Sequence, residues 1–250
     1  MLGALGAFGA VAAAPLTVRA LGIAVANEAQ TTAKNVDAPA CVLTPAVGEG
    51  PYFVDERLHR SDIAGGSSDA GVRDGVPLAL KIHLSSVRDR SCRPIAGVQV
   101  DVWHASAIGQ YSDEPAGFGQ ASTQGQTWLR GYQISDASGN VVFNTIYPGW
   151  YPGRPVHIHV KARLFSASGK TAYEFTSQLF FDDAVNDLVM ALPTYNTRGS
   201  RGTRNANEGI RDDHHSLLAR VTPMPNGARG YLATASLGLS LGPTERTVVR

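Results

Sequence analysis

The chain has 250 residues, of which 43% are hydrophobic, and a formal net charge of +1. It has neither a basic stripe nor a block of like charges, so charge gives no reason to expect a nucleic-acid or membrane-surface partner. The length is typical of one globular domain, and 27 glycines and 14 prolines favour short strands joined by turns over long helices.

Residues 1–40 are predicted to be an export signal followed by a linker. The apolar stretch MLGALGAFGAVAAAPLTVRALGIAVA is too short to cross a bilayer comfortably but typical of a signal peptide, with Ala24-Val25-Ala26 as the candidate cleavage site. No basic segment precedes it, so we expect the true start upstream of Met1, and an arginine pair there would indicate the twin-arginine route. A periplasmic or extracellular protein, free of the membrane after processing, is expected. The alternative is a buried or frayed N-terminal helix in a cytoplasmic protein.

The two cysteines, Cys41 and Cys92, do not form a C-x-x-C pair of the kind found in zinc and redox sites. A single disulfide is expected if the protein is exported, and two unpaired, partly buried thiols are the alternative.

Three β-hairpins are predicted along the chain, after a segment from 41 to 63 that we expect to lie extended across the body. Alternating apolar residues indicate strands in PLALKIHLSSV (77–87) and VQVDVWHA (98–105), which would pair with each other. A second hairpin is predicted in LRGYQISDASGNVVFNTIYPG (129–149), around a turn of Asp, Ser, Gly and Asn. VHIHVKARLF and TAYEFTSQLFFDD, joined by SASGK, predict the third.

The remaining chain adds one long loop, one helix and one strand. Residues 105–127 are polar and glycine-rich, and loops of this length are usually functional or disordered. Asp182 or Asp183 could cap a helix over 182–192, and GYLATASLGLSL predicts a final strand. These elements predict an all-β fold: an antiparallel β-sandwich of short strands with long loops and one short helix, forming a single domain over 41–250.

The stretch YPGWYPGRPVHIHV (147–160) concentrates polar chemistry. His157 and His159 lie two apart on a predicted strand, so their side chains point to the same face, although such a pair alone is more often ordinary polar residues than metal ligands. Tyr151 lies upstream and is followed by Pro-Gly, which lets the chain fold back towards the histidines. Tyr111, in the long loop, is a fourth candidate. Imidazole nitrogens with phenolate oxygens suit ferric iron better than zinc.

Residues 77–182 resemble the intradiol ring-cleaving catechol dioxygenases, the family of protocatechuate 3,4-dioxygenase and catechol 1,2-dioxygenase. The segments that carry the resemblance are VWHASAIGQYSD, LRGYQISDASGNVVFNTIYPGWY and GRPVHIHVKA, together with EGPYF and HRSDI nearer the N-terminus. The resemblance is greatest to short exported members that carry TIYPGWYPGR.

The resemblance implies a site and a cofactor. Tyr111, Tyr151, His157 and His159 would be ligands of Fe(III), and Tyr151 would also be the ligand that substrate displaces. Arg154 would stabilise negative charge on the substrate ring, and Gln178 would line the pocket. Tyr52 would border the substrate, although a packing role is equally compatible with its position.

Other residues are not expected to bind the metal. Tyr147 competes with Tyr151, but the order WYPGR favours Tyr151. His104, Asp213, His214 and His215 lack partners at ligand spacing and are interpreted as solvated or locally hydrogen-bonded. The segment WHAS lacks the Cys and Asp that exported relatives often have there, which leaves Cys41 and Cys92 to pair with each other.

The activity implied by the resemblance is cleavage of a catechol by O₂ between its two hydroxyl-bearing carbons, which gives a cis,cis-muconate-type product. Two alternatives remain at this point: a β-sandwich module that binds carbohydrate or a cell-wall component without catalysis, and a metal-storage or copper-binding sandwich. Neither the particular catechol nor the oligomeric state follows from the sequence.

Overall fold

The structure is a computed structural model that describes residues 42–64, 74–88, 91–117, 120–207 and 217–242. These residues fall in one compact unit, Ala38–Arg250. The predicted export signal, Cys41, Asp213, His214 and His215 lie outside the described residues. The export signal and the domain boundary near residue 41 therefore stay predictions.

The described residues form mainly strands. The elements are β1 (Pro77–Arg88), β2 (Ser91–Pro94), β3 (Gln99–Trp103), β4 (Arg130–Ile134), β5 (Asn140–Ile146), β6 (His157–Phe165), β7 (Thr171–Phe180), α1 (Asp183–Met190), η2 (Asn196–Arg198), η3 (Asn205–Asn207), β8 (Leu217–Leu218), β9 (Arg220–Pro223), η4 (Pro225–Gly227) and β10 (Tyr231–Leu239). Within the described ranges, no helix is long and apolar enough to span a bilayer.

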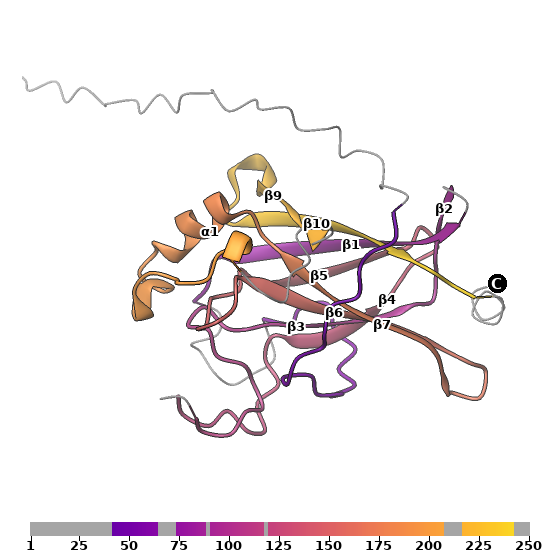
Figure 1. Cartoon of the computed structure of the whole chain (residues 1–250), viewed down its shortest axis with the longest axis horizontal. Helices are drawn as coiled ribbons and strands as arrows, with labels where there is room; N and C mark the ends of the chain where they lie inside the picture. The colour runs from indigo at the N-terminus through magenta and orange to yellow at the C-terminus, as the bar shows by residue number, and fades with distance from the viewer. Residues whose placement is uncertain (1–41, 65–73, 89–90, 118–119, 208–216, 243–250) are drawn as a thin grey trace, which may run out of the picture. The chain divides into compact units, whose positions relative to one another are not determined.

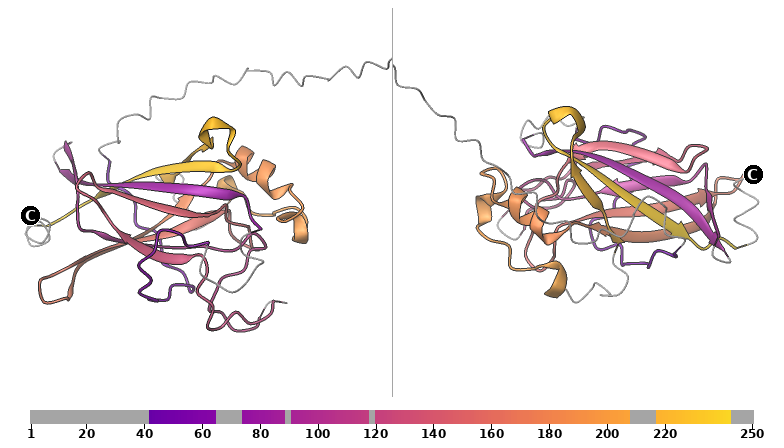
Figure 2. Two further views of the ribbon diagram at one scale, coloured as in Figure 1. Left: turned by 180° about the vertical axis from the view of Figure 1, so that it is seen from behind. Right: turned by 90° about the horizontal axis from the view of Figure 1, so that it is seen from above.

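Two five-stranded sheets form the layers of a sandwich (Figure 1). One sheet has the order β2-β1-β10-β9, with β5 also paired to β1, and the other has the order β4-β3-β6-β7-β8. The view from above in Figure 2 shows β1 and β10 running side by side. Apolar side chains of both sheets, among them Leu80, Ile82, Val100 and Ile158, are fully buried and form one core. The all-β sandwich expected from the sequence is confirmed.

The pairing of the strands corrects two of the predicted hairpins. β1 pairs with β2, β5 and β10, whereas β3 lies in the other sheet between β4 and β6. β4 and β5 also belong to different sheets, because the turn at Asp136–Gly139 carries the chain from one layer to the other. The third hairpin, β6–β7, is confirmed. The sheets are mixed, since β1–β10 and β7–β8 are parallel pairs.

The helix and the final strand agree with the sequence. Helix α1 begins after Asp182, whose side chain accepts a hydrogen bond from the Ala184 amide at 2.7 Å. This carboxylate satisfies one of the amides that a helix start leaves without a partner. In Figure 1, α1 lies at one end of the sandwich. The strand predicted in GYLATASLGLSL forms as β10.

Strand β6 carries two different faces, and this division positions the site. Its even-numbered residues, from Ile158 to Leu164, point into the core between the sheets. Its odd-numbered residues, His157, His159, Lys161 and Arg163, share the outer face and are nevertheless buried. Residues 42–64 cover this face, as predicted for an extended segment (Figure 1).

Ion pairs hold the covering segment in place. Lys161 pairs with Glu49 of the segment and with Glu174 of β7. Arg163 donates to Asp55 of the segment at 2.9 Å and to Asp101 of β3 at 2.8 Å. These ion pairs offset the cost of burying the two cations. Residues 42–64 therefore close the outer face of the sheet around β6. His157 and His159, the first two odd-numbered residues of β6, lie beneath this cover.

Candidate metal centre

Four polar atoms converge at the start of β6. The Nε2 atoms of His157 and His159 lie 3.1 Å apart, and the Tyr111 hydroxyl lies 3.1 Å from His159 Nε2 and 3.5 Å from His157 Nε2. The Tyr151 hydroxyl lies 3.2 Å from His157 Nε2. The structure thus brings together the four residues that the sequence singled out, from one strand and two loops.

Two glycines allow the two loops to cross. A Cβ atom on Gly149 would collide with the carbonyl oxygens of Ser106 and Ala107, and one on Gly109, whose φ is +72°, would collide with the Trp150 carbonyl. The Gly149 amide donates to Ser106 O at 3.0 Å at this crossing. Close backbone approach needs glycine at such points. The crossing brings the rings of Tyr111 and Tyr151 to a centroid separation of 5.7 Å.

Both histidines are held neutral. Burial lowers the pKa of His157 to about 3, and the positive charge of Arg154 adds to the lowering. Burial also lowers the pKa of His159 well below its ordinary value, with further contributions from His157 and Arg154. His157 Nδ1 donates to Pro155 O at 2.7 Å, which leaves a lone pair on Nε2 facing the other three atoms. Neutral imidazoles oriented in this way are suited to metal binding.

The neighbours of His159 fix its ring but not its second nitrogen. The Trp103 indole, on the adjacent strand, stacks on the ring at a centroid distance of 4.8 Å and an interplanar angle of 7°. His159 Nδ1 is buried, and none of the described residues offers it a hydrogen-bond partner. The nitrogen that faces the convergent atoms is Nε2, and its lone pair, not Nδ1, is what a cation in the cluster would complete.

The phenol of Tyr111 is protonated without a cation. Burial raises the pKa of Tyr111 well above its ordinary value, and Tyr151 adds to the rise, whereas Arg154 lowers it. Two adjacent phenols in a buried site cannot both ionise unless positive charge compensates them. A metal ion would supply that charge.

The donor set fits one small metal ion. The two histidine Nε2 atoms, the Tyr111 hydroxyl with each of them, and the Tyr151 hydroxyl with His157 Nε2 are separated by 3.1–3.5 Å. These separations match those between neighbouring ligands that each bond a metal at about 2 Å. Among the described residues, no group of three or more His, Cys, Asp or Glu side chains is placed to hold a metal. The candidate site therefore depends on its two tyrosines, and hard phenolate oxygens favour a hard, highly charged cation.

A cavity of about 440 Å³ opens onto the two tyrosines. Tyr52 forms one wall: its ring stacks on Tyr111 at 4.2 Å and 17°, and meets Tyr151 edge-on at 6.0 Å. Pro152 and residues 109–111, 114–117 and 120–121 line much of the remainder, with Glu114 and Arg198 as charged members. The cavity has the size of a small-molecule site, with aromatic rings beside the convergent polar atoms.

Arg154 is oriented by a buried glutamine. Its Nη2 donates to Gln178 Oε1 at 2.5 Å, and Gln178 Nε2 donates to Gly48 O at 2.8 Å. Gln178 is only 1% exposed and lies opposite His159 on β7. Both ends of its amide thus make bonds inside the protein, and one of these bonds orients Arg154. A role of Gln178 in lining the substrate pocket stays a prediction.

Comparison with known proteins identifies the family. The sequence model of a family described as "Dioxygenase" matches residues 48–198, which is more than half of the chain and includes all four convergent residues. An intradiol ring-cleavage dioxygenase from Tetranychus urticae has a similar structure, with a TM-score of 0.65 and 29% identity over 80% of this chain and 95% of that one. The chain belongs to the intradiol ring-cleavage dioxygenases.

Other members of the family are also similar. The dioxygenase domain of a dioxygenase carbohydrate-binding protein fusion from Streptomyces sp. SirexAA-E has a TM-score of 0.55 and 28% identity, with coverage of 80% of this chain and 100% of that one. Chlorocatechol 1,2-dioxygenase of Rhodococcus opacus is 27% identical over 137 residues, which is 47% of this chain and 50% of that protein. The chain thus spans about half the length of this curated relative.

The residues set aside in the sequence lie elsewhere in this intradiol dioxygenase fold. The Tyr147 hydroxyl donates to Asn186 Oδ1 at 2.8 Å in the core. His104 donates from Nδ1 to Ala105 O at 2.9 Å and lies 2.7 Å from the Thr145 hydroxyl through Nε2. Cys92 is disulfide-bonded. Because Cys41 lies outside the described residues, the pairing of these two cysteines stays a prediction.

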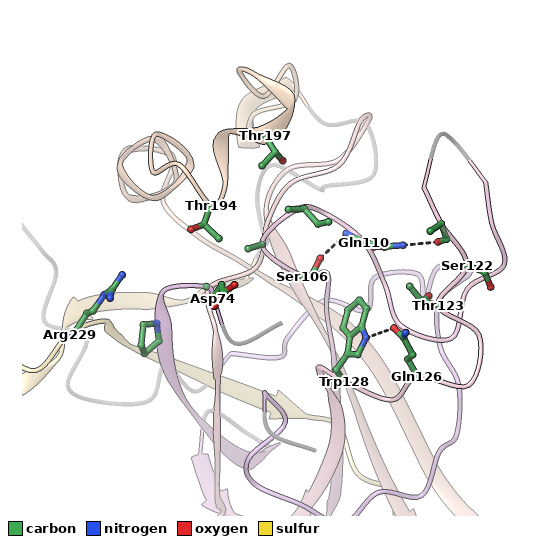
Figure 3. Close-up of a pocket in the computed structure, with 15 residues that line it drawn as sticks. Asp74, Ser106, Gln110, Ser122, Thr123, Gln126, Trp128, Thr194, Thr197 and Arg229 are labelled. Carbon is green, nitrogen blue, oxygen red and sulfur yellow. Dashed lines mark hydrogen bonds between the residues drawn. The ribbon is translucent and has the colours of Figure 1, made fainter. Parts of the chain in front are cut away.

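A second, larger cavity of about 960 Å³ lies beside the segment that leads to Tyr111 (Figure 3). Its lining is mostly uncharged, with Asp74 and Arg229 as the charged members, and it shares Gln110 and Ala121 with the first cavity. Gln110 Nε2 donates to Ala121 O at 2.8 Å, which ties these shared residues together. None of the predicted site residues lines this second cavity.

Sequence reasoning missed two features of the site. The first is the pair Gly109 and Gly149, which could have been suspected only as glycines close to the two tyrosines. The second is Arg130, at the start of a predicted strand, whose buried guanidinium reaches the backbone on both sides of the first cavity. A lone arginine in the segment LRGYQ gives no signal of burial.

Proposed function

We propose that this protein is an Fe(III)-dependent intradiol dioxygenase that cleaves a catechol with O₂ between its two hydroxyl-bearing carbons, giving a cis,cis-muconate-type diacid. The observation that carries the proposal is the convergence of two neutral imidazoles and two phenols within 3.5 Å, beside an aromatic-walled cavity. A non-catalytic binding module needs no such convergence, and we do not favour it.

The four convergent residues would hold the iron through His157 Nε2, His159 Nε2 and the hydroxyl oxygens of Tyr111 and Tyr151. Bound ferric iron would act as a Lewis acid that lets a catechol lose both hydroxyl protons near neutral pH. Both tyrosines line the cavity, but Tyr111 is buried, whereas Tyr151 is only partly buried. The Tyr151 oxygen is therefore the better placed of the two to leave its position and accept a catechol proton.

The remaining residues would orient the ring and its charge. The stacked Tyr52 and Tyr111 rings give the catechol an aromatic wall. Arg154, fixed by Gln178, lies close enough to affect the pKa of Tyr111 and of both histidines. Its guanidinium would stabilise negative charge that develops on the ring, an effect that is strongest where water is excluded.

Oxygen uptake tests the proposal most directly. Iron-loaded protein should consume O₂ with catechol, protocatechuate or hydroxyquinol, and should be reddish from charge transfer between tyrosinate and iron. Tyr151→Phe should lose the activity, whereas Tyr147→Phe, a matched tyrosine outside the cluster, should keep it. A fully iron-loaded but colourless sample, or the absence of O₂ uptake with every catechol, would contradict the proposal.

We also propose that the protein is exported. The disulfide at Cys92 supports an oxidising compartment, where such bonds persist. Fractionation of cells that express the full-length gene, with the N-terminal residue of the product determined, tests this. A cytosolic product that retains Met1 would contradict export.

A further inference from the structure

Arg130, the first residue of β4, is a buried cation that joins two separate parts of the chain. It is 3% exposed. Its Nε donates to Ser112 Oγ at 2.7 Å, its Nη2 to Ser112 O at 2.6 Å and its Nη1 to Tyr52 O at 2.5 Å. One planar guanidinium thus binds the segment that covers β6 and the loop that follows β3.

The two bonded segments carry the two rings that stack on each other. Tyr52 is itself a bonded residue, and Ser112 directly follows Tyr111. The rings of Tyr52 and Tyr111 lie 4.2 Å apart at 17°. Ser112 extends the connection, because its hydroxyl donates to Trp128 O at 2.8 Å. Thr123 also holds this loop, because its hydroxyl donates to Tyr111 O at 2.8 Å. Arg130 is the side chain that bonds the backbone beneath both rings.

The cation has no close anionic partner to account for its burial. None of the ion pairs between described residues includes Arg130, and its three bonds end on neutral oxygens. Burial lowers the pKa of Arg130, while the more distant Glu56 and Glu114 raise it, and a guanidinium keeps its proton in proteins. Burying a charge without an ion pair is costly. Its advantage here is the rigid fork of donors, which no neutral side chain supplies.

The backbone at both ends of this connection is strained. Leu129, directly before Arg130, has φ of 57°, and Asp113, directly after Ser112, has φ of 58°. Neither residue is a glycine, and such conformations persist only where surrounding contacts impose them. The bonds from Arg130 to Ser112, together with the bond from the Ser112 hydroxyl to Trp128 O, connect the two positions.

We propose that Arg130 is a positioning residue: it fixes the Tyr52–Tyr111 ring stack, and so places both the Tyr111 hydroxyl among the convergent atoms and the Tyr52 ring as a wall of the cavity. The first part concerns the protein alone. The consequence for iron and catechol rests on the proposed function.

The test compares Arg130→Gln and Arg130→Lys with Arg201→Lys. Arg201 is a matched control, because it is also buried and makes several hydrogen bonds, but to Asp183 and Asp187 at α1. Ring protons of Tyr52 and Tyr111, observed by NMR of iron-free protein with labelled tyrosine, should show ring-current shifts from the stack. We expect these shifts to be lost in Arg130→Gln, reduced in Arg130→Lys and kept in Arg201→Lys.

The same variants give a second readout through iron. Substitution of a residue that orients a metal ligand typically lowers metal affinity by about 10–100-fold. We expect a loss of this size in Arg130→Gln, a displaced tyrosinate-to-iron absorption band and a raised KM for catechol, with values for Arg201→Lys within about twofold of wild type.

Unchanged ring shifts in folded Arg130→Gln would overturn the proposal, whether or not the protein cleaves catechol. If Arg130→Gln does not fold, Arg130→Lys and Ser112→Ala decide in its place, and wild-type ring shifts in both would overturn the proposal. Wild-type protein with the expected ring stack but no activity would instead refute the proposed function alone.

Discussion

The Nε2 atoms of His157 and His159 face each other at 3.1 Å on the covered outer face of a β-sheet. Strand geometry alone puts the two side chains on one face, and burial then keeps both rings neutral. The pair is thereby ready to bind a cation without first losing protons at neutral pH.

Removal of one imidazole should abolish stabilisation by metal. Iron that binds only the folded state at about 1,000 times its Kd should add about 4 kcal/mol to the free energy of unfolding. We expect this gain in wild type and its loss in His159→Asn, as measured by thermal unfolding with and without iron. His83→Asn, in the opposite sheet, should keep the gain. Equal stabilisation of all three proteins would contradict the ligand assignment.

Acidification should destabilise the fold through His104. Burial lowers the pKa of His104 to about 4, whereas the unfolded chain has the ordinary value of about 6.5. Between these values only the unfolded chain takes up the proton, so stability falls as pH falls from about 6.5 to 4, by up to about 1.4 kcal/mol per pH unit. Below pH 4 this contribution changes no further.

Urea unfolding of iron-free protein across this range measures the slope. We expect a shallower slope in His104→Gln, which removes the titrating group. Parallel curves for wild type and His104→Gln would show that His104 does not cause the acid sensitivity.

Gly149→Ala should force the two tyrosine-bearing loops apart. The new methyl group would meet the backbone oxygens of Ser106 and Ala107, which cannot move as a flexible side chain would. We expect a loss of about 1–3 kcal/mol in stability, together with weaker iron binding, measured by denaturation and by equilibrium dialysis. Gly202→Ala, where nothing lies within 4 Å, is the control. Wild-type iron affinity in Gly149→Ala would exclude a role of the crossing in the site.

Gln178 should act on turnover through Arg154. Gln178→Met keeps the volume but removes the acceptor for Arg154 Nη2. Removing one charge-stabilising group commonly lowers kcat about 100-fold or more, and we expect a smaller, roughly tenfold loss when Arg154 remains but is misplaced. Arg154→Met and the double variant should then have similar kcat values. Fully multiplicative effects would show that the two residues act independently.

The histidine pair could be predicted from sequence because residues two apart in a strand always lie on the same face. Strand partners could not, because alternation shows which face is buried but not which strand lies alongside. For this reason the sequence predicts a hairpin at the turn after β4, although this turn leads from one sheet to the other. The alternation of apolar residues within a strand does not indicate which sheet the next strand joins.

The remainder of the site depends on long-range contacts. The sequence offers Tyr111 only as a candidate, and the family resemblance makes it a ligand. Its approach to Tyr151 depends on two glycines with no distinctive pattern around them. Arg130 was overlooked, since charged residues at strand ends are usually exposed. Its burial becomes apparent only when residues 42–64 are seen to cover the sheet.

The parallel pairing of β1 with β10 has a consequence for how the chain folds. Leu78 lies opposite Tyr231, so one sheet joins strands from distant parts of the sequence. Contacts between distant residues carry a large entropy cost of closure and slow folding. β3, β4, β6 and β7, which form most of the other sheet, all end by Phe180. We therefore expect the histidine-bearing sheet to assemble early, while the chain is still being synthesised, and its partner sheet to close last.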